Sequence, residues 1–157
     1  MTKFLLSVHV LAAIITVGSV TVAASMFPAF ARRAAAEPGG GQPVVVLGTL
    51  HRICRVYAAV GIVVPVFGFA TAISLGALGD TWLMISIGLT AAAAGVLALM
   101  VLPDQAKILT QLTGMSHPTA PARAVISQLA MYTGTFNLLW ATVTVLMIIR
   151  PGSTTGA

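Results

Sequence analysis

Four long stretches without a single Asp, Glu, Lys or Arg limit the folds open to this chain. They run over residues 4–27, 56–75, 82–102 and 130–149. About 20 apolar residues cross a bilayer as an α-helix, and one charged side chain at mid-membrane would cost about 3 kcal/mol or more. The sequence therefore predicts an all-α integral membrane protein, a four-helix bundle that forms one transmembrane domain over residues 1–157.

Composition supports lipid as the medium around these stretches. Hydrophobic residues make up 58% of the chain and charged residues only 7%, whereas about a quarter of the residues in soluble domains are charged. The net charge of +5 does not indicate nucleic-acid binding, because the basic residues flank apolar segments instead of forming a polar face. We expect the lipid bilayer, and no nucleic acid, as a partner.

The distribution of Lys and Arg predicts the orientation in the membrane. Two basic residues, Lys3 and Arg150, lie at the termini, and none lies between the second and third stretches. The other two connections carry six: Arg32, Arg33, Arg52, Arg55, Lys107 and Arg123. Because basic loops stay in the cytoplasm, we expect both of these connections inside and both termini on the non-cytoplasmic side of the cell's inner (plasma) membrane.

Proline and glycine indicate where the helices end. The connector over residues 37–43 interrupts the first helix, and its Pro43 suits the first turn of the next one. A helical extension is expected after Pro103 and ends near Thr113. Pro65 should kink the second helix, because it lacks an N–H and clashes with the carbonyl one turn earlier.

A tight turn is expected between the second and third stretches. Gly76 and Gly79 lie next to Asp80, which has the character of an N-cap residue. Trp82 follows as an anchor at the membrane interface.

Small residues at helical spacing predict how the helices pack, since close backbone approach stabilises bundles in lipid. Each stretch offers one such face, and we expect the four faces to meet. They are His9, Ala12, Ala13, Thr16 and Ala23; then Gly61, Pro65, Gly68 and Ala72; then Gly88, Ala92, Gly95 and Ala98; and last Gly134, Asn137, Ala141 and Thr144.

His9 is the only ionisable residue inside the first stretch. An intramembrane histidine that faces the bundle interior marks a functional site by default, because its nitrogens need partners and can ligate metal or haem iron. Two interpretations stay open for it, a structural hydrogen bond and ligation. Met84 and Met147 are the candidates for a second, cofactor-binding ligand, and core packing is the other interpretation of both.

Other polar residues predict less chemistry. Cys54 is the only cysteine, so the chain can form no internal disulfide. His51 neighbours Arg52 and is interpreted as part of a basic cluster that is solvated or faces the lipid headgroups, with a metal role as the alternative. Asn137 is expected to form an interhelical hydrogen bond worth about 1 kcal/mol. No nucleotide loop, nucleophile elbow or pair of carboxylates is recognisable.

Three segments carry a resemblance to known families: residues 4–12 (FLLSVHVLA), 50–55 (LHRICR) and 146–152 (LMIIRPG). They resemble a bacterial family of predicted integral membrane proteins, domain of unknown function 2269. The chain is more distantly similar to four-helix membrane proteins of the CopD and HemJ types. The resemblance implies the four-helix fold and a vestigial or altered haem or metal pocket at His9. HemJ-type proteins have more histidine later in the chain, so oxidase activity is not carried over.

These features favour a non-catalytic, accessory role for the protein. We expect it to act by association, as a homo-oligomer or within a larger membrane complex. The alternative is a membrane protein that binds haem b or copper through His9. A transporter is disfavoured, because neither internal inverted repeats nor a pair of broken helices is evident in the sequence.

Overall fold

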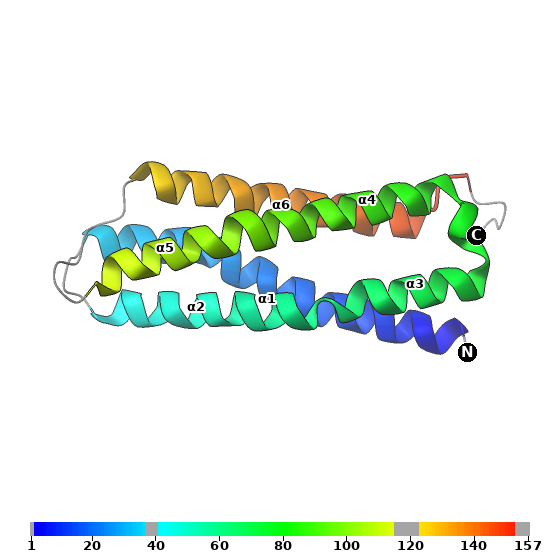
Figure 1. Ribbon diagram of the computed structural model, residues 1–157, viewed down its shortest axis with the longest axis horizontal. Coiled ribbons are helices and arrows are strands. Elements are labelled where there is room, and N and C mark those ends of the chain that lie inside the picture. The colour runs from blue at the N-terminus through cyan, green and yellow to red at the C-terminus, as the bar shows by residue number, and fades with distance from the viewer. Residues whose placement is uncertain (1, 37–40, 115–122, 153–157) are drawn as a thin grey trace.

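The computed structural model describes residues 2–36, 41–114 and 123–152 and consists of helices within them (Figure 1). The all-helical prediction is thus confirmed. The described helices form four continuous helical units, called assemblies below, over Thr2–Ala36, Gly41–Leu75, Thr81–Thr113 and Arg123–Ile149. Each of the four is long and apolar enough to cross a membrane. In chain order the elements are α1 (Thr2–Ala36), α2 (Gly41–Val60), α3 (Val63–Leu75), the 3-10 turn η1 (Ala77–Gly79), α4 (Thr81–Val96), the π-helical segment η2 (Leu97–Val101), α5 (Leu102–Thr113) and α6 (Arg123–Ile149).

The helices lie side by side along one long axis (Figure 1). One end holds the start of α1, the end of α6 and η1, and we call it the terminal end; the other is the loop end. Helix α1 packs against α2, α3 and α6, while α4 packs against α6 and α5 against α2. Pro43 lies in the first turn of α2 and α5 ends at Thr113, as predicted. Residues 37–40 and 115–122 of the two connectors lie outside the described part.

Pro65 interrupts the second helical assembly, as predicted. The carbonyl of Gly61, four residues earlier, accepts the amide of Val64 at 3.0 Å, because proline has no N–H to offer it. The amide of Ile62 in turn bonds only three residues back, to Ala59. Helix α2 therefore ends at Val60 and α3 begins at Val63.

A second interruption was not predicted. The π-helical segment η2 precedes Pro103 in the third assembly. Proline at this position clashes with the carbonyl four residues back, and a widened turn relieves that clash. Two of the four assemblies are therefore interrupted, each next to a proline, although no broken pair is evident in the sequence.

The turn at the terminal end differs from expectation in one detail. Gly76 adopts the left-handed conformation at φ 68° that ends α3, and Asp80 occupies the N-cap position of α4. Its carboxylate, however, makes no capping bond and accepts the indole N–H of Trp82 at 3.0 Å. The guanidinium of Arg150 lies over the Trp82 ring, 5.7 Å from its centroid. Trp82 is buried at this contact.

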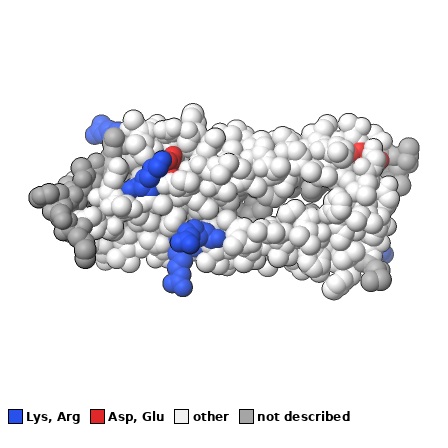
Figure 2. Space-filling model, in the orientation of Figure 1, with Lys and Arg blue, Asp and Glu red and all other residues white. Residues whose placement is uncertain are grey.

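The buried apolar core is concentrated toward the loop end. Its largest fully buried side chains include Phe27, Leu47, Ile108, Ile126 and Leu129. A small second cluster of Ala72, Trp82 and Leu83 lies at the terminal end. The terminal half thus has a much thinner core, and on the face drawn in Figure 2 its surface is hollowed between α3 and α4.

Exposed large apolar side chains lie almost entirely within the four predicted spans. Among the described residues, the exceptions are Val45 and Leu78, and all others fall in 4–27, 56–75, 82–102 or 130–149. The face drawn in Figure 2 has no charged side chain over the middle of this region. We call these exposed side chains the apolar belt. A surface of this kind is unfavourable in water and favourable in lipid.

The predicted small-residue face is correct in α1, only partly correct in the second helical assembly, where Pro65 is exposed, and wrong in the other two. Thr16, Ala23 and Ala72 are buried. In α4 and α6, however, most of the predicted residues point outward: Gly88, Ala92, Ala98, Gly134, Ala141 and Thr144 are exposed. Larger side chains fill the space between these two helices instead, such as Leu97 and Phe136.

Candidate functional site

His9 lies between α1 and α3, next to the helix interruption. Its ring is half-buried, and Nδ1 lies 2.8 Å from the carbonyl oxygen of Val64. Since a carbonyl oxygen only accepts, Nδ1 carries the proton and donates it. In the neutral ring Nε2 therefore keeps its lone pair.

Gly68 provides the space for this ring. A Cβ added to Gly68 would lie 2.8 Å from Cε1 and 3.0 Å from Nδ1 of His9. Real Cβ atoms almost never come that close to another atom, so a side chain here would displace the imidazole. The contact with the His9 ring thus explains why position 68 of the predicted small-residue face requires glycine.

The structure does not bring the two candidate methionines together with His9 in one cluster. The side chain of Met84 is 60% exposed on α4, so it points away from the bundle. Met147 packs against the cluster of Ala72, Trp82 and Leu83. Within residues 2–36, 41–114 and 123–152, no group of three or more His, Cys, Asp or Glu side chains could hold a metal ion.

A second histidine forms a polar cluster that sequence reasoning missed. Nδ1 of His51 donates to Oε1 of Gln105 at 3.0 Å. The Gln105 amide donates in turn to Sγ of Cys54 at 3.7 Å. Gln105 and Cys54 are fully buried. His51 itself is half-buried, and Gln105 of α5 gives its ring a buried partner across the helix interface, a contact that the sequence did not predict.

Asn137 forms the predicted interhelical hydrogen bond. Its amide Nδ2 donates to Oγ of Ser25 on α1 at 3.1 Å. The Oδ1 atom of Asn137 and the hydroxyl of Thr133 are buried without a partner. Two polar atoms on the side of α6 near α1 therefore stay unsatisfied.

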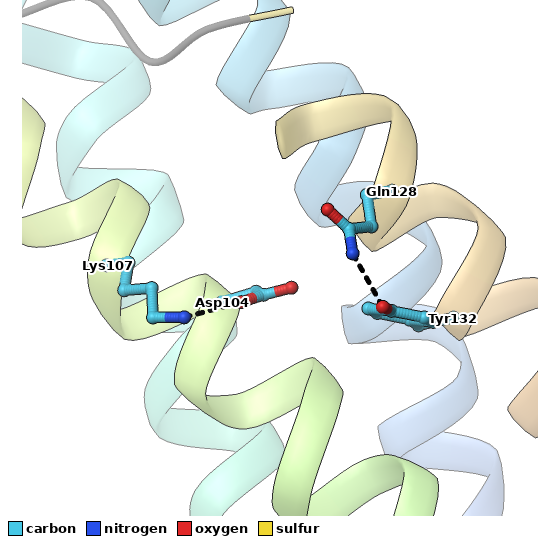
Figure 3. A network of polar contacts seen from close by, with 4 residues as sticks. All are labelled: Asp104, Lys107, Gln128 and Tyr132. Atoms are coloured by element: carbon cyan, nitrogen blue, oxygen red, sulfur yellow. Dashed lines mark hydrogen bonds and ion pairs between the residues drawn. The ribbon is translucent and has the colours of Figure 1, made fainter. Parts of the chain in front are cut away.

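Polar contacts near the loop end also include two pairs on neighbouring helices (Figure 3). Lys107 and Asp104 form an ion pair on α5 at 3.2 Å. On α6 the amide of Gln128 donates to the hydroxyl of Tyr132 at 2.6 Å. Each pair joins residues one turn apart on one helix, so neither ties α5 to α6.

Four small residues give α4 a flat outward surface. Gly88, Ala91 and Ala92 are exposed and Gly95 is half-buried, and a Cβ on either glycine would meet no atom within 4 Å. Gly88 and Ala92 are four residues apart, as are Ala91 and Gly95, so both pairs lie one turn apart on one face. We call these four residues the α4 outer face.

Comparison with family models, curated proteins and solved structures gives no match to the chain. The candidate functions therefore rest on the geometry described above.

Proposed function

We propose that the chain is a multi-pass protein of the cell's inner (plasma) membrane, with both termini on the non-cytoplasmic side. The exposed apolar belt supports the insertion. The length of the second span agrees, because the twenty residues from Val56 to Leu75 correspond to about 30 Å of helix, the thickness of the hydrocarbon layer. The basic residues begin where that length ends, at the loop end.

Two engineered cysteines test this orientation in a Cys54→Ser background. Leu78 in the turn at the terminal end and Gln111 on α5 are both exposed, so a cysteine at either position can be labelled. A membrane-impermeant maleimide should label Leu78→Cys in intact cells and Gln111→Cys only after lysis. The reverse pattern would overturn the orientation, and a protein that stays in solution without detergent would overturn the insertion.

Within this membrane placement, we propose that the protein has a non-catalytic, accessory role and acts by helix association through the α4 outer face. The observation that carries this proposal is that these small residues point away from the bundle. Lipid gives no hydrophobic drive for helices to associate, so a surface of Gly and Ala lets a second backbone approach closely and gain van der Waals contact. The partner is a second copy of the chain or a helix of a larger membrane complex.

Bulky substitutions test the association. Gly88→Leu with Gly95→Leu should raise the dissociation constant of the oligomer or complex at least tenfold, which is about 1.4 kcal/mol. The readout is energy transfer between labelled copies in liposomes, with co-purification from membranes for a larger complex.

Gly18→Leu is the matched control for these variants. Gly18 is an exposed helical glycine on α1 with no atom near its added Cβ, but Ile14, Ile15 and Val22 surround it with exposed bulk. The control should leave association unchanged. Equal behaviour of the control and the α4 variants would refute the proposal.

A second candidate function is haem or copper binding at His9. One observation favours it: Nδ1 donates to a backbone carbonyl, the outer hydrogen bond that orients metal-ligating histidines and leaves Nε2 for the metal. The bound group would supply redox chemistry, and His9 would hold it. Because Met84 points outward, we assign it no part, and Met147 remains the methionine candidate.

The visible spectrum and metal content of the protein purified in detergent separate the two candidates. A Soret band or bound copper that is lost in His9→Ala and kept in His51→Ala would support the His9 site. A protein without haem or copper after expression with both in supply would refute it and leave association through α4.

A further inference from the structure

A cavity of about 420 Å³ opens between α1 and α6 at the loop end. Its volume lies within the range of about 300–1,000 Å³ that is typical of small-molecule sites. Arg32 and Arg123 line it from the two helices, together with Ser127 of α6. Ile126 and Ala130 form its apolar wall on α6, and two alanines line it on α1.

The two arginines give this cavity a positively charged lining. Among the described residues the one ion pair is Lys107–Asp104, so neither Arg32 nor Arg123 pairs with a carboxylate there. The neighbouring Arg33 behaves differently, because its guanidinium lies over the ring of Phe30 at 5.2 Å. Two like charges that line one cavity repel each other, and an anion between them removes that repulsion. The planar guanidinium suits phosphate best, since it donates two parallel hydrogen bonds.

The cavity follows α6 over about 10 Å, the rise from Arg123 to Ala130. Its lining on α6 passes in chain order from Arg123 through Ile126 and Ser127 to Ala130, and on α1 two alanines lie closer to the loop end than Arg32. Ala130 is also the first residue of the fourth predicted span, so the apolar part of the cavity meets the level where the acyl chains begin. Inorganic phosphate has no apolar group that could contact this part of the cavity.

We propose that the cavity binds the phosphate group of an anionic phospholipid of the cytoplasmic leaflet. Arg32 and Arg123 contact the phosphate, Ser127 donates to one of its oxygens, and the glycerol end lies toward Ala130. Basic pockets between membrane helices on the cytoplasmic side bind such headgroups by this chemistry. The proposal rests on the membrane placement proposed above, and it is independent of association through α4.

Native mass spectrometry of the full chain in detergent tests the site. Dioleoylphosphatidylglycerol, dioleoylphosphatidylcholine and inorganic phosphate are added separately, and the bound fraction gives each dissociation constant. The double variant Arg32→Gln with Arg123→Gln should weaken binding of the phosphatidylglycerol at least tenfold. The matched control is Arg52→Gln with Arg55→Gln, which removes the same charge from exposed positions on α2 and should change the constant less than threefold.

Further comparisons separate the sources of the phosphate. Ala130→Leu narrows the apolar part without a change in charge, so it should weaken binding of the phospholipid and leave inorganic phosphate unaffected. Thermal unfolding of each variant shows that it is folded. Equal loss in both double variants, or equal affinity for the phosphatidylcholine, would overturn the site. Inorganic phosphate that binds as tightly as the phosphatidylglycerol would overturn the phospholipid as its source, and both results leave the membrane placement standing.

Discussion

Gly68→Ala should destabilise the protein, although glycine to alanine normally strengthens a helix. The added Cβ would lie 2.8 Å from Cε1 of His9, so the ring must move and its 2.8 Å bond from Nδ1 to the Val64 carbonyl is lost or stretched. Overpacking costs about 1–3 kcal/mol. The gain in helix propensity is at most about 1 kcal/mol. With the full gain subtracted, the net loss in the free energy of unfolding is about 0–2 kcal/mol.

Gly134→Ala is the control for this prediction, because a Cβ there meets no atom within 4 Å. It gains the same propensity without a clash, so its free energy of unfolding should rise by up to about 1 kcal/mol. Both variants are measured by reversible unfolding in mixed micelles, with helix content followed by circular dichroism. The two substitutions should differ by about 1–3 kcal/mol, the cost of the clash alone.

A double-mutant cycle identifies the imidazole as the cause. His9→Ala removes the ring, so Gly68→Ala should cost nothing in that background, and the coupling energy should lie between about 1 and 3 kcal/mol. Additive effects of the two substitutions would show that His9 does not lie on Gly68, and the reasoning about this contact would be refuted.

Three further substitutions test buried polar groups by the same unfolding assay. Thr133→Val removes a buried hydroxyl without a partner, so the free energy of unfolding should stay the same or rise by up to about 1 kcal/mol. A decrease of more than about 1 kcal/mol would mean that the hydroxyl has a partner. Gln105→Leu leaves Nδ1–H of His51 without its acceptor and should cost about 1–3 kcal/mol, so an unchanged midpoint would contradict the cluster. Asp80→Ala removes the acceptor of the Trp82 indole, should cost about 0.5–1.5 kcal/mol and should shift the tryptophan emission; an unshifted spectrum would argue against this bond.

The positions of the helices were predictable because one strong constraint determines them. Charged side chains are excluded from lipid, so the gaps between charges identify the four long helices. Pro65 predicted the interruption between α2 and α3 because it removes a backbone donor, although α1 continues through Pro28. The widened turn before Pro103 was missed for a different reason. The clash of the Pro103 ring with the carbonyl four residues back can be relieved by a π-helical turn or by a kink, and the neighbouring helices decide which of the two forms.

The inward faces of α4 and α6 were not predictable by the same reasoning. Both sides of a helix in lipid are apolar, so hydrophobicity does not tell the core from the exterior. In α4, alanine occupies every position from 91 to 94, and small residues therefore lie on all sides of that helix. The burial of Gln105 was missed for a related reason: the sequence does not show which side of the extension after Pro103 faces α2, and the structure buries Gln105 against Cys54.

The uneven core connects the fold to both proposals. The main core lies toward the loop end, with Leu47 and Ile108 beyond the predicted spans and Phe27 within one. Toward the terminal end the core is thin, and large apolar side chains point outward, with the α4 outer face among them. In the proposed membrane placement, lipid around this part would give no hydrophobic drive for burial. One half can therefore hold the fold together while the other remains free to associate. A loop-end core substitution such as Leu47→Ala should then lower stability by about 2–5 kcal/mol without weakening association per folded molecule, whereas Gly88→Leu should weaken association without lowering stability.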